Sequence, residues 1–501
     1  MRQAFKPKLQ SGEVRIPDID FDLDSRDDIP HVLRGLQQLY ANPELRDEAL
    51  KLLDECLPKN VDRDTGRTGM DFWTILVLGV LRLALNCDYD RLAELANEHR
   101  TVRLMLGHLL TDLENRYGRT TIIENVSMIT PEALEKISAL IVKCGHDLLG
   151  QTGTVLLGRC DSVVVETDVE FPTDARILLD AMRRLLKACQ RAKAAGISTW
   201  RQYWYQYQTL RNLYLRALKL RKSQAKDQAK VDARKQEIRA AYQAFLARAR
   251  GLVARIEAAL EALLLMEKNP LAVELCEEIE RFLPHAHRQI DQIHRRVILD
   301  ETIPHEEKVF SVFEEYTEWV SKGKAGVLVE LGVRVAIVED QFQFILHHRV
   351  MAGETDEQVP VKIVQNTQAI FPDFRACSFD KGFSSAANRG DLEKLLDLVV
   401  LPKKGKWSEK DRERETAEDF VAMRRQHSAV ESAINALEIH GLDRCCDHGL
   451  DGFKRYVAWA VVGRNLLRLG SIAIELDREQ RRRTECVRQR REDLTRQRCA
   501  A

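Results

Sequence analysis

The sequence predicts a mixed α/β domain that is interrupted by a long helical insertion and preceded by an all-helical N-terminal domain. Strand-like segments rich in β-branched and apolar residues are concentrated at 154–168 and 326–401. The intervening residues 175–296 are almost continuous helix formers, and residues 31–150 also show a helical pattern. One sheet built from both strand-rich regions, with the helical residues inserted between them, is the most economical arrangement.

Length and pattern together divide the chain into five segments. A chain of 501 residues is too long for one core and suggests two to four domains. We expect a helical N-terminal domain at 1–150, two parts of a sheet domain at 151–174 and 297–475, and a helical or coiled-coil insertion at 175–296. The arginine-rich tail, 476–501, is expected to have little fixed structure.

Composition limits the classes of function and the compartment. The 77 basic and 77 acidic residues balance, so binding to nucleic acid must depend on local basic patches. Eleven cysteines without metal-ligand spacing indicate a reducing compartment, and Cys445, Cys446 and His448 lack the second ligand pair of a structural zinc site. The N-terminus has no apolar signal core, and the longest apolar run, 72–85, is too short to span a bilayer. We expect a soluble cytoplasmic protein.

Two adjacent helical runs in the N-terminal region, 71–86 and 89–107, are joined by only two residues. The second run carries Arg91, Arg100 and Arg103. Helix–turn–helix units that enter a DNA groove have this pattern, and so do ordinary helical hairpins. We therefore treat these three arginines as candidates for recognising DNA.

The helical insertion contains two further patterns. Between residues 238 and 263 the apolar positions alternate in steps of four and three, which predicts the seam of an antiparallel coiled coil. Before it, in residues 200–222, arginine and lysine interleave with tryptophan and tyrosine. Such a stretch can stack on bases and hold phosphates, or its aromatic residues can simply pack against neighbouring helices.

Strand character returns after the insertion. Residues 326–350 predict a hairpin that turns at Glu339 and Asp340, and a third strand near 375–379 leads directly into Asp380. Helices are then expected at 388–398, 410–437 and 453–475.

Three distant acids are candidates for one site. Asp161 lies inside the apolar strand VLLGRCDSVVVETD, where a buried carboxylate without a cation or donor would be costly. Asp380 follows a strand and precedes a tight turn, and Glu431 borders the apolar face of a helix. Two bound Mg²⁺ ions need carboxylates that converge from separate elements in this way. The alternatives are that Asp161 is a salt-bridged or solvated acid, or that Asp168 is the first acid of the site.

The segments around these acids resemble the three catalytic blocks of the DDE insertion-sequence transposases, and the ISNCY group in particular. The segments are CDSVVVETDVEFPTD, FDKGFSSAANRGDL and RRQHSAVESAINALEIHG, and the likeness covers most of residues 65–470. The resemblance implies an RNase H-like fold and a catalytic, metal-binding triad of Asp161, Asp380 and Glu431. It also implies two Mg²⁺ or Mn²⁺ ions and a synaptic dimer or larger oligomer. The expected partners are the terminal inverted repeats of the element and target DNA, both double-stranded.

The sequence departs from related enzymes near the glutamate. His427 stands four residues before Glu431, where related enzymes often have arginine, and Glu438 stands seven after it, where they often have lysine. Other side chains would then have to bind the DNA phosphates. The candidates are Arg424, Arg425, His427, Lys403, Lys404 and Lys406 beside Trp407, and the cluster at 481–483. Two other functions fit the same residues: a catalytically silent domesticated transposase that binds DNA, and an RNase H-like nuclease without strand transfer.

Overall fold

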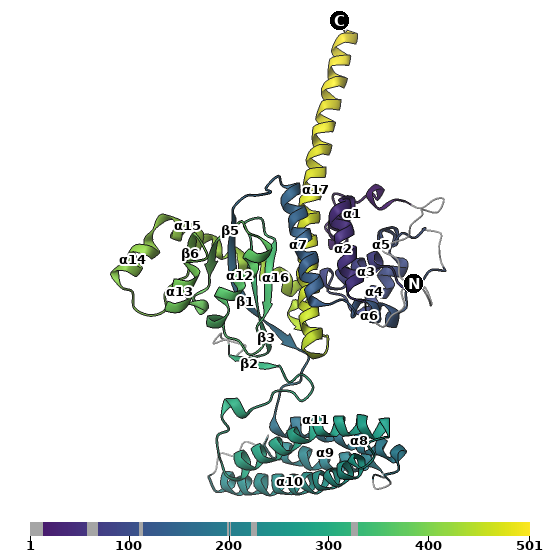
Figure 1. Cartoon of the computed structure of the whole chain (residues 1–501), viewed down its shortest axis with the longest axis vertical. Helices are drawn as coiled ribbons and strands as arrows, with labels where there is room; N and C mark the ends of the chain where they lie inside the picture. The colour runs from purple at the N-terminus through teal and green to yellow at the C-terminus, as the bar shows by residue number, and fades with distance from the viewer. Residues whose placement is uncertain are drawn as a thin grey trace. The chain divides into compact units, whose positions relative to one another are not determined.

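The computed structural model contains two compact units, one formed by residues 1–168 and 322–501 and the other by Val169–Ser321. It describes residues 14–57, 69–109, 114–197, 200, 202–221, 228–321 and 329–500. The first unit is mixed α/β and the second is mainly helical (Figure 1). The predicted α/β class is therefore confirmed, and the two strand-rich regions contribute to one sheet.

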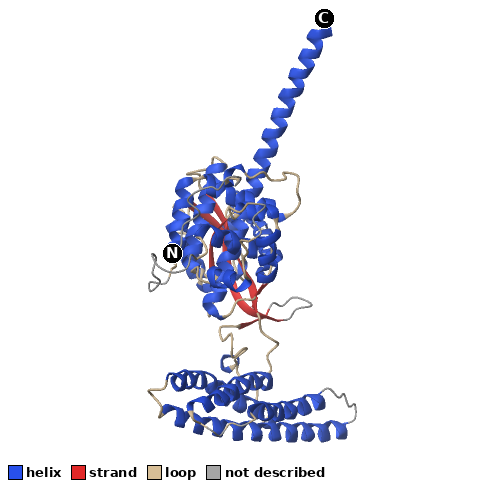
Figure 2. Cartoon of the chain, turned by 90° about the vertical axis from the view of Figure 1, so that its right-hand side faces the viewer, coloured by secondary structure: helices blue, strands red, loops and turns tan. Residues whose placement is uncertain are grey.

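The sheet of the first unit combines antiparallel and parallel pairing, and helices flank its strands in Figure 2. Its strands are β1 (Leu156–Thr167), β3 (Val329–Glu339), β4 (Ile345–Val350), β5 (Phe374–Phe379), β6 (Leu398–Val400) and β7 (Arg444–Cys445). The central order is β4-β3-β1-β5-β6, in which β3 is antiparallel to β1 and β4 is antiparallel to β3. Strands β5 and β6 continue the sheet in parallel with β1, and the short β7 pairs with the end of β1.

The hairpin predicted at 326–350 is confirmed as β3 and β4. Its turn is fixed by Asp340, which is fully buried and accepts hydrogen bonds from the backbone N–H groups of Phe342 and Phe344. The second carboxylate oxygen of Asp340 lies 2.7 Å from Nε2 of His146 on α7 (Pro131–Leu148). A buried carboxylate is thus satisfied on both oxygens, which ties the hairpin to the helical layer.

The N-terminal helices belong to the same compact unit as the sheet. They are α1 (Asp28–Ala41), α2 (Pro43–Glu55), α3 (Phe72–Ala84), α4 (Tyr89–Glu98), α5 (Arg100–Met105), α6 (Arg119–Val126) and α7 (Pro131–Leu148). All residues of α3 are buried, and α17 (Gly449–Ala500) packs against α1, α3 and α7. The segment expected to form a separate domain at 1–150 therefore shares the core of this unit.

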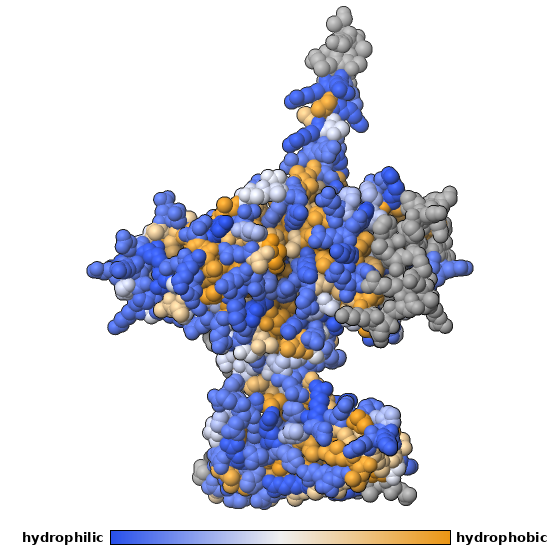
Figure 3. Space-filling model, in the orientation of Figure 1, coloured by the Kyte–Doolittle hydropathy of each residue, from blue (hydrophilic) through white to orange (hydrophobic). Residues whose placement is uncertain are grey.

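Helix α17 extends through the arginine-rich tail. The expectation that 476–501 has little fixed structure is wrong, because the helix continues to Ala500. Arginine, glutamine and glutamate are good helix formers, and ion pairs such as Arg488–Glu492 connect successive turns. Figure 3 shows this part of the helix as mostly hydrophilic. The N-terminal part of α17 is apolar and long enough to span a membrane, but 83% of its apolar window is buried in the structure.

The helices after the hairpin differ from the prediction in their number and bounds. They are α12 (Pro360–Ile370), α13 (Ala386–Leu392), α14 (Glu409–Thr416), α15 (Glu418–His427) and α16 (Ala429–Leu437). The helix expected at 410–437 is thus three helices, with breaks at Ala417 and Ser428. The helix expected at 388–398 ends earlier, and α12 was not predicted.

The second unit contains four main helices around one core. They are α8 (Asp174–Arg191), α9 (Tyr203–Arg221), α10 (Gln228–Leu264) and α11 (Pro270–Ile293). The apolar seam predicted at 238–263 faces this core, with Phe245, Leu252 and Ile256 fully buried. The seam is confirmed, but it packs in a multi-helix core rather than in an isolated arm. The unit also includes η3 (His294–Ile298), η4 (His305–Glu307) and β2 (Glu318–Ser321), so it extends beyond the expected boundary at 296.

Candidate active site

Asp161 lies on β1, and Asp380 directly follows the neighbouring parallel strand β5, at the same level of the sheet. The register pairs Cys160 of β1 with Phe379 of β5, so the next residues along the two strands are the two aspartates. Asp380 directly follows β5 and caps the short helix η6 (Lys381–Phe383), where its Oδ2 accepts from the backbone N–H of Gly382 at 3.2 Å. The strand pairing brings together two acids that are far apart in the sequence.

Glu431 reaches the same region from a helix. It lies in the first turn of α16, which packs against β1, and its side chain is exposed. The negative charges of both Asp380 and Glu431 act on Asp161 and on His427. The structure therefore places the three predicted acids within electrostatic reach of one another.

His427 ends α15 and faces the sheet beside these acids. Its Nδ1 lies 2.9 Å from the hydroxyl oxygen of Ser378 on β5. Burial lowers the pKa of His427, the cation of Arg159 lowers it further, and the two nearby carboxylates oppose the shift. The ring is therefore mainly neutral near pH 7, available as a hydrogen-bond donor or acceptor rather than as a fixed cation.

Arg159 connects strand β1 to helix α15. It is buried two residues before Asp161, and its guanidinium donates to the backbone oxygens of Asp340 at 2.5 Å and Gln426 at 3.4 Å. It also lies 3.5 Å from the carboxylate of Glu339. The side chain therefore holds the C-terminal end of α15, and with it His427, against β1.

A fourth acid, Asp356, belongs to this cluster and was not predicted. Its Oδ1 accepts a hydrogen bond of 2.8 Å from Ser162, and its charge acts on Asp161. A Cβ atom added at Gly382 would lie 3.4 Å from Oδ2 of Asp380 and 3.5 Å from Oδ2 of Asp356. The Oδ2 atoms of Asp380 and Asp356 can therefore be no farther apart than the sum of the two distances, 3.4 Å and 3.5 Å. Asp356 begins the short 3-10 helix η5 (Asp356–Gln358). Its polar neighbours in the sequence do not mark it as a site residue, so only the proximity revealed by folding identifies it.

The clustering of carboxylates changes the protonation of Asp161. Burial is the main cause that raises its pKa to about 6, and the charges of Asp380, Glu431 and Asp356 add to it. A hydrogen bond of 2.7 Å from the backbone N–H of Ser162 opposes the shift. A bound cation would favour the ionised form and reverse the effect of the neighbouring acids.

The carboxylate oxygens at this site are of the type that binds magnesium or manganese. Their positions in the structure, however, are too far apart to coordinate one ion. Carboxylate oxygens are the hard ligands that these ions prefer. Within the described parts of the chain, however, no three His, Cys, Asp or Glu side chains meet closely enough to hold a metal ion. The acids therefore interact electrostatically, and their side chains would have to move closer together to coordinate an ion.

Asp168, the alternative to Asp161 as the first acid of the site, lies beyond the end of β1. It is exposed and forms an ion pair with Arg444. The geometry therefore favours Asp161 as the first acid.

The candidate DNA-binding residues of the N-terminal helices divide into exposed and buried groups. Arg91 on α4 and Arg100 on α5 are exposed. Arg103 is buried and donates to the backbone oxygens of Asn97 at 3.1 Å and Asn115 at 3.4 Å. The predicted second helix of the pair breaks at His99, which turns Arg103 inward, so we withdraw it as a DNA contact.

The basic residues near the C-terminal acids also differ in their availability. Lys404 donates to the backbone oxygen of Gly382 at 2.8 Å and to Glu357 at 2.6 Å, which places it beside the turn that follows Asp380. Lys403 pairs with Asp411, and Arg424 lies 3.8 Å from Glu415. Lys406 and Arg425 are exposed. Of the candidate DNA-binding lysines, Lys404 is therefore the one with a hydrogen bond to the turn after Asp380.

Comparisons of the chain with protein-family models, with curated proteins and with solved structures gave no match.

Proposed function

We propose that the chain is a cytoplasmic DNA transposase that cleaves DNA at the ends of an insertion sequence and joins the freed 3′-hydroxyl to target DNA. The observation that carries the proposal is the electrostatic clustering of Asp380 and Glu431 around Asp161. The three acids come from a central strand, from the turn directly after its parallel neighbour and from a helix that packs on the sheet. The catalytic blocks that resemble DDE transposases contain these same three acids.

The strand order supports an RNase H-like core for this unit. In chain order the five main strands are β1, β3, β4, β5 and β6, and their spatial order is third, second, first, fourth, fifth. The first three are antiparallel and the last two run parallel to the first. This mixed sheet has Asp161 on its central strand and Asp380 directly after the adjacent parallel strand, an arrangement compatible with the RNase H-like core that the resemblance implies. The helical unit enters after β1, as an insertion would.

In the proposed chemistry the three acids bind the metal ions. Asp161, Asp380 and Glu431 would hold Mg²⁺ or Mn²⁺, and two such ions supply activation of the attacking oxygen and stabilisation of the leaving oxygen. In-line displacement at phosphorus leaves little covalent work for the protein, so positioning and charge account for most of the rate. Lys404 and the neutral His427 lie where they can orient the scissile phosphate.

The proposed DNA contacts come from exposed cations. Arg91 and Arg100 would recognise the DNA at the ends of the insertion sequence. Lys406, Arg425 and the cluster at 481–483 would bind DNA phosphates without regard to sequence. Double-stranded terminal repeats and target DNA would be held by a dimer or larger synaptic oligomer. The balanced charge of the whole chain requires such local patches.

A strand-transfer assay tests the proposal. The substrate is duplex DNA carrying inverted repeats found beside the gene, with Mg²⁺ or Mn²⁺ added in separate reactions. We expect cleaved and joined products from the natural chain. Asp161→Asn, Asp380→Asn and Glu431→Gln should each lower cleavage by about 100-fold or more while end binding is retained. Asp168→Asn is the matched control and should cleave normally.

The products separate the three functions. Joined DNA supports the transposase, cleavage alone supports an RNase H-like nuclease, and binding alone supports a silent DNA-binding descendant. If any one of the three variants cleaves at nearly the natural rate, that residue is not part of the site. If Asp168→Asn alone is inactive, the assignment of the first acid is wrong.

A further inference from the structure

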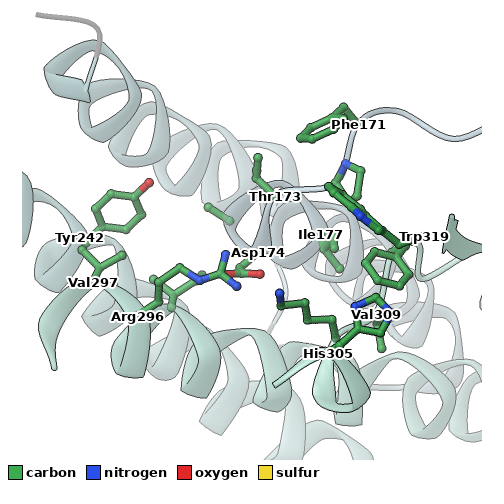
Figure 4. Close-up of a pocket in the computed structure, with 15 residues that line it drawn as sticks. Phe171, Thr173, Asp174, Ile177, Tyr242, Arg296, Val297, His305, Val309 and Trp319 are labelled. Atoms are coloured by element: carbon green, nitrogen blue, oxygen red, sulfur yellow. The ribbon is translucent and has the colours of Figure 1, made fainter. Parts of the chain in front are cut away.

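The helical unit contains a pocket that the proposed DNA chemistry does not use. Its volume is about 380 Å³, and all of its lining residues lie within Val169–Ser321 (Figure 4). It is formed by the start of α8, by α10, by η3 and by the chain from His305 to Trp319. Small-molecule pockets usually have volumes of roughly 300–1,000 Å³, so this one fits a compact ligand.

One wall of the pocket is aromatic. The ring of Trp319 lies 5.7 Å from that of Phe171 and 5.6 Å from that of Phe310, measured between centroids. His305 adds a further ring 5.6 Å from Phe310. Phe171 is 66% exposed, although burial of a phenylalanine is normally favourable. These residues offer flat surfaces on which a planar ring can stack.

The pocket also carries an excess of positive charge. Arg296 of η3 pairs with Asp174 at 2.7 Å, yet its side chain remains 42% exposed and has donors beyond those that one carboxylate can use. Lys308 also lines the pocket and forms no ion pair with any residue in the described part of the chain. With one carboxylate and two cations, the lining favours an anion. Arg296 is presented by a π-helical turn, a rare backbone form that is common at functional sites.

A buried polar group completes the lining. Tyr242 of α10 is only 3% exposed and borders the pocket, and its hydroxyl makes no hydrogen bond to any described residue. Buried tyrosine hydroxyls usually have a partner. A ligand that accepts or donates a hydrogen bond at this position would supply one.

We propose that this pocket binds a free nucleoside monophosphate. The base would stack on the wall formed by Phe171, Phe310 and Trp319, and the phosphate would be bound by Arg296 and Lys308. A purely apolar ligand would leave both cations unused, and inorganic phosphate would leave the aromatic wall exposed. A ligand that joins a flat ring to a phosphate satisfies both parts of the lining.

Titration calorimetry on the full chain tests the proposal with adenosine monophosphate as the probe. We expect a Kd on the order of 100 μM, with adenosine and inorganic phosphate each binding at least about tenfold more weakly. Lys308→Gln should weaken binding by about tenfold. Lys268→Gln, the same exchange at an exposed lysine between α10 and α11, should leave binding unchanged.

The proposal is overturned if the nucleotide does not bind at millimolar concentration, if adenosine binds equally well, or if the two lysine variants lose binding equally. Trp319→Leu provides a second variant, because removing its ring should also weaken binding if the base stacks there. Circular dichroism checks that each variant keeps its helices. A 5′-phosphorylated single-stranded oligonucleotide distinguishes the source of the nucleotide. If it displaces the free nucleotide from the pocket at equal concentration, the free nucleotide is not the intended ligand.

Discussion

Asp161 is the residue at which burial and like charges oppose ionisation most clearly in the proposed active site. Its folded pKa is about 6, above its ordinary value of 3.8. For an acid with a raised pKa, the folded state gains stability when the group is protonated. That contribution is complete below about pH 4 and is lost as the pH rises through 6.

Asp161→Asn should therefore stabilise the metal-free protein at pH 7.5. Asparagine stays neutral, so the variant avoids a cost on the order of 2 kcal/mol that the natural chain incurs above pH 6. Thermal melting should show a Tm a few degrees higher at pH 7.5 and no gain at pH 4. Mg²⁺ or Mn²⁺ should raise the Tm of the natural chain more than that of the variant. Asp168→Asn is the control, and a gain that is independent of pH would contradict the explanation.

The sequence predicts single residues well where an unusual residue type interrupts a regular pattern. Asp161 stands out because it interrupts an apolar strand, and Asp380 because it directly follows one. Asp356 has no such signal, since its neighbours are polar and its proximity to Asp380 arises from the folded chain. Arg103 was misjudged for the opposite reason: a helical pattern does not reveal a break at His99, which decides where the side chain points.

At the scale of elements, α1 and α17 approach so closely that their crossing point requires glycine. A Cβ atom at Gly470 would lie 1.7 Å from the backbone oxygen of His31, and one at Gly35 would lie 2.2 Å from that of Leu466. Both contacts involve helix backbone, which cannot move aside as a flexible side chain can. The conformational cost of glycine in a helix is here offset by close packing.

Gly470→Ala should consequently destabilise the first unit by at least about 1–3 kcal/mol, as overpacked cores do. Gly390→Ala is the matched control in the same unit, because a Cβ atom there meets nothing within 4 Å. Alanine favours helix over glycine by about 0.5–1 kcal/mol, so the control should be neutral or slightly stabilising. Urea denaturation measures both. Equal stability of the two variants would mean that the helices separate at little cost.

Element type was easier to predict than element boundaries. The β3–β4 hairpin and β5 follow from their β-branched and apolar residues. The three helices at 409–437 were expected as one, because no proline or glycine marks the breaks at Ala417 and Ser428. Neither residue opposes helix on its own, so the local propensity of the chain does not determine where it bends. The same limit applies to the tail, where helix formers extend α17 although residues 479–492 are all exposed.

At the scale of the whole molecule, the chain contains one unit made of two distant segments and one made of a single continuous segment. The core of the helical unit is built entirely from residues between Ala175 and Val312. The sequence predicts an insertion because helix formers separate two strand-rich regions. It does not reveal that residues up to Ser321 belong with the helices, because 297–321 lacks a clear period.

The fragment 169–321 should fold without the rest of the chain, because its core requires no residue from outside it. We expect a strongly helical circular dichroism spectrum and one cooperative transition in urea. Phe245→Ala removes a fully buried ring and should destabilise the fragment by about 3–5 kcal/mol. Trp204→Ala is the control, because that side chain is 54% exposed and should contribute far less. A fragment that stays unfolded, or that loses equal stability in both variants, would show that its core depends on the other unit.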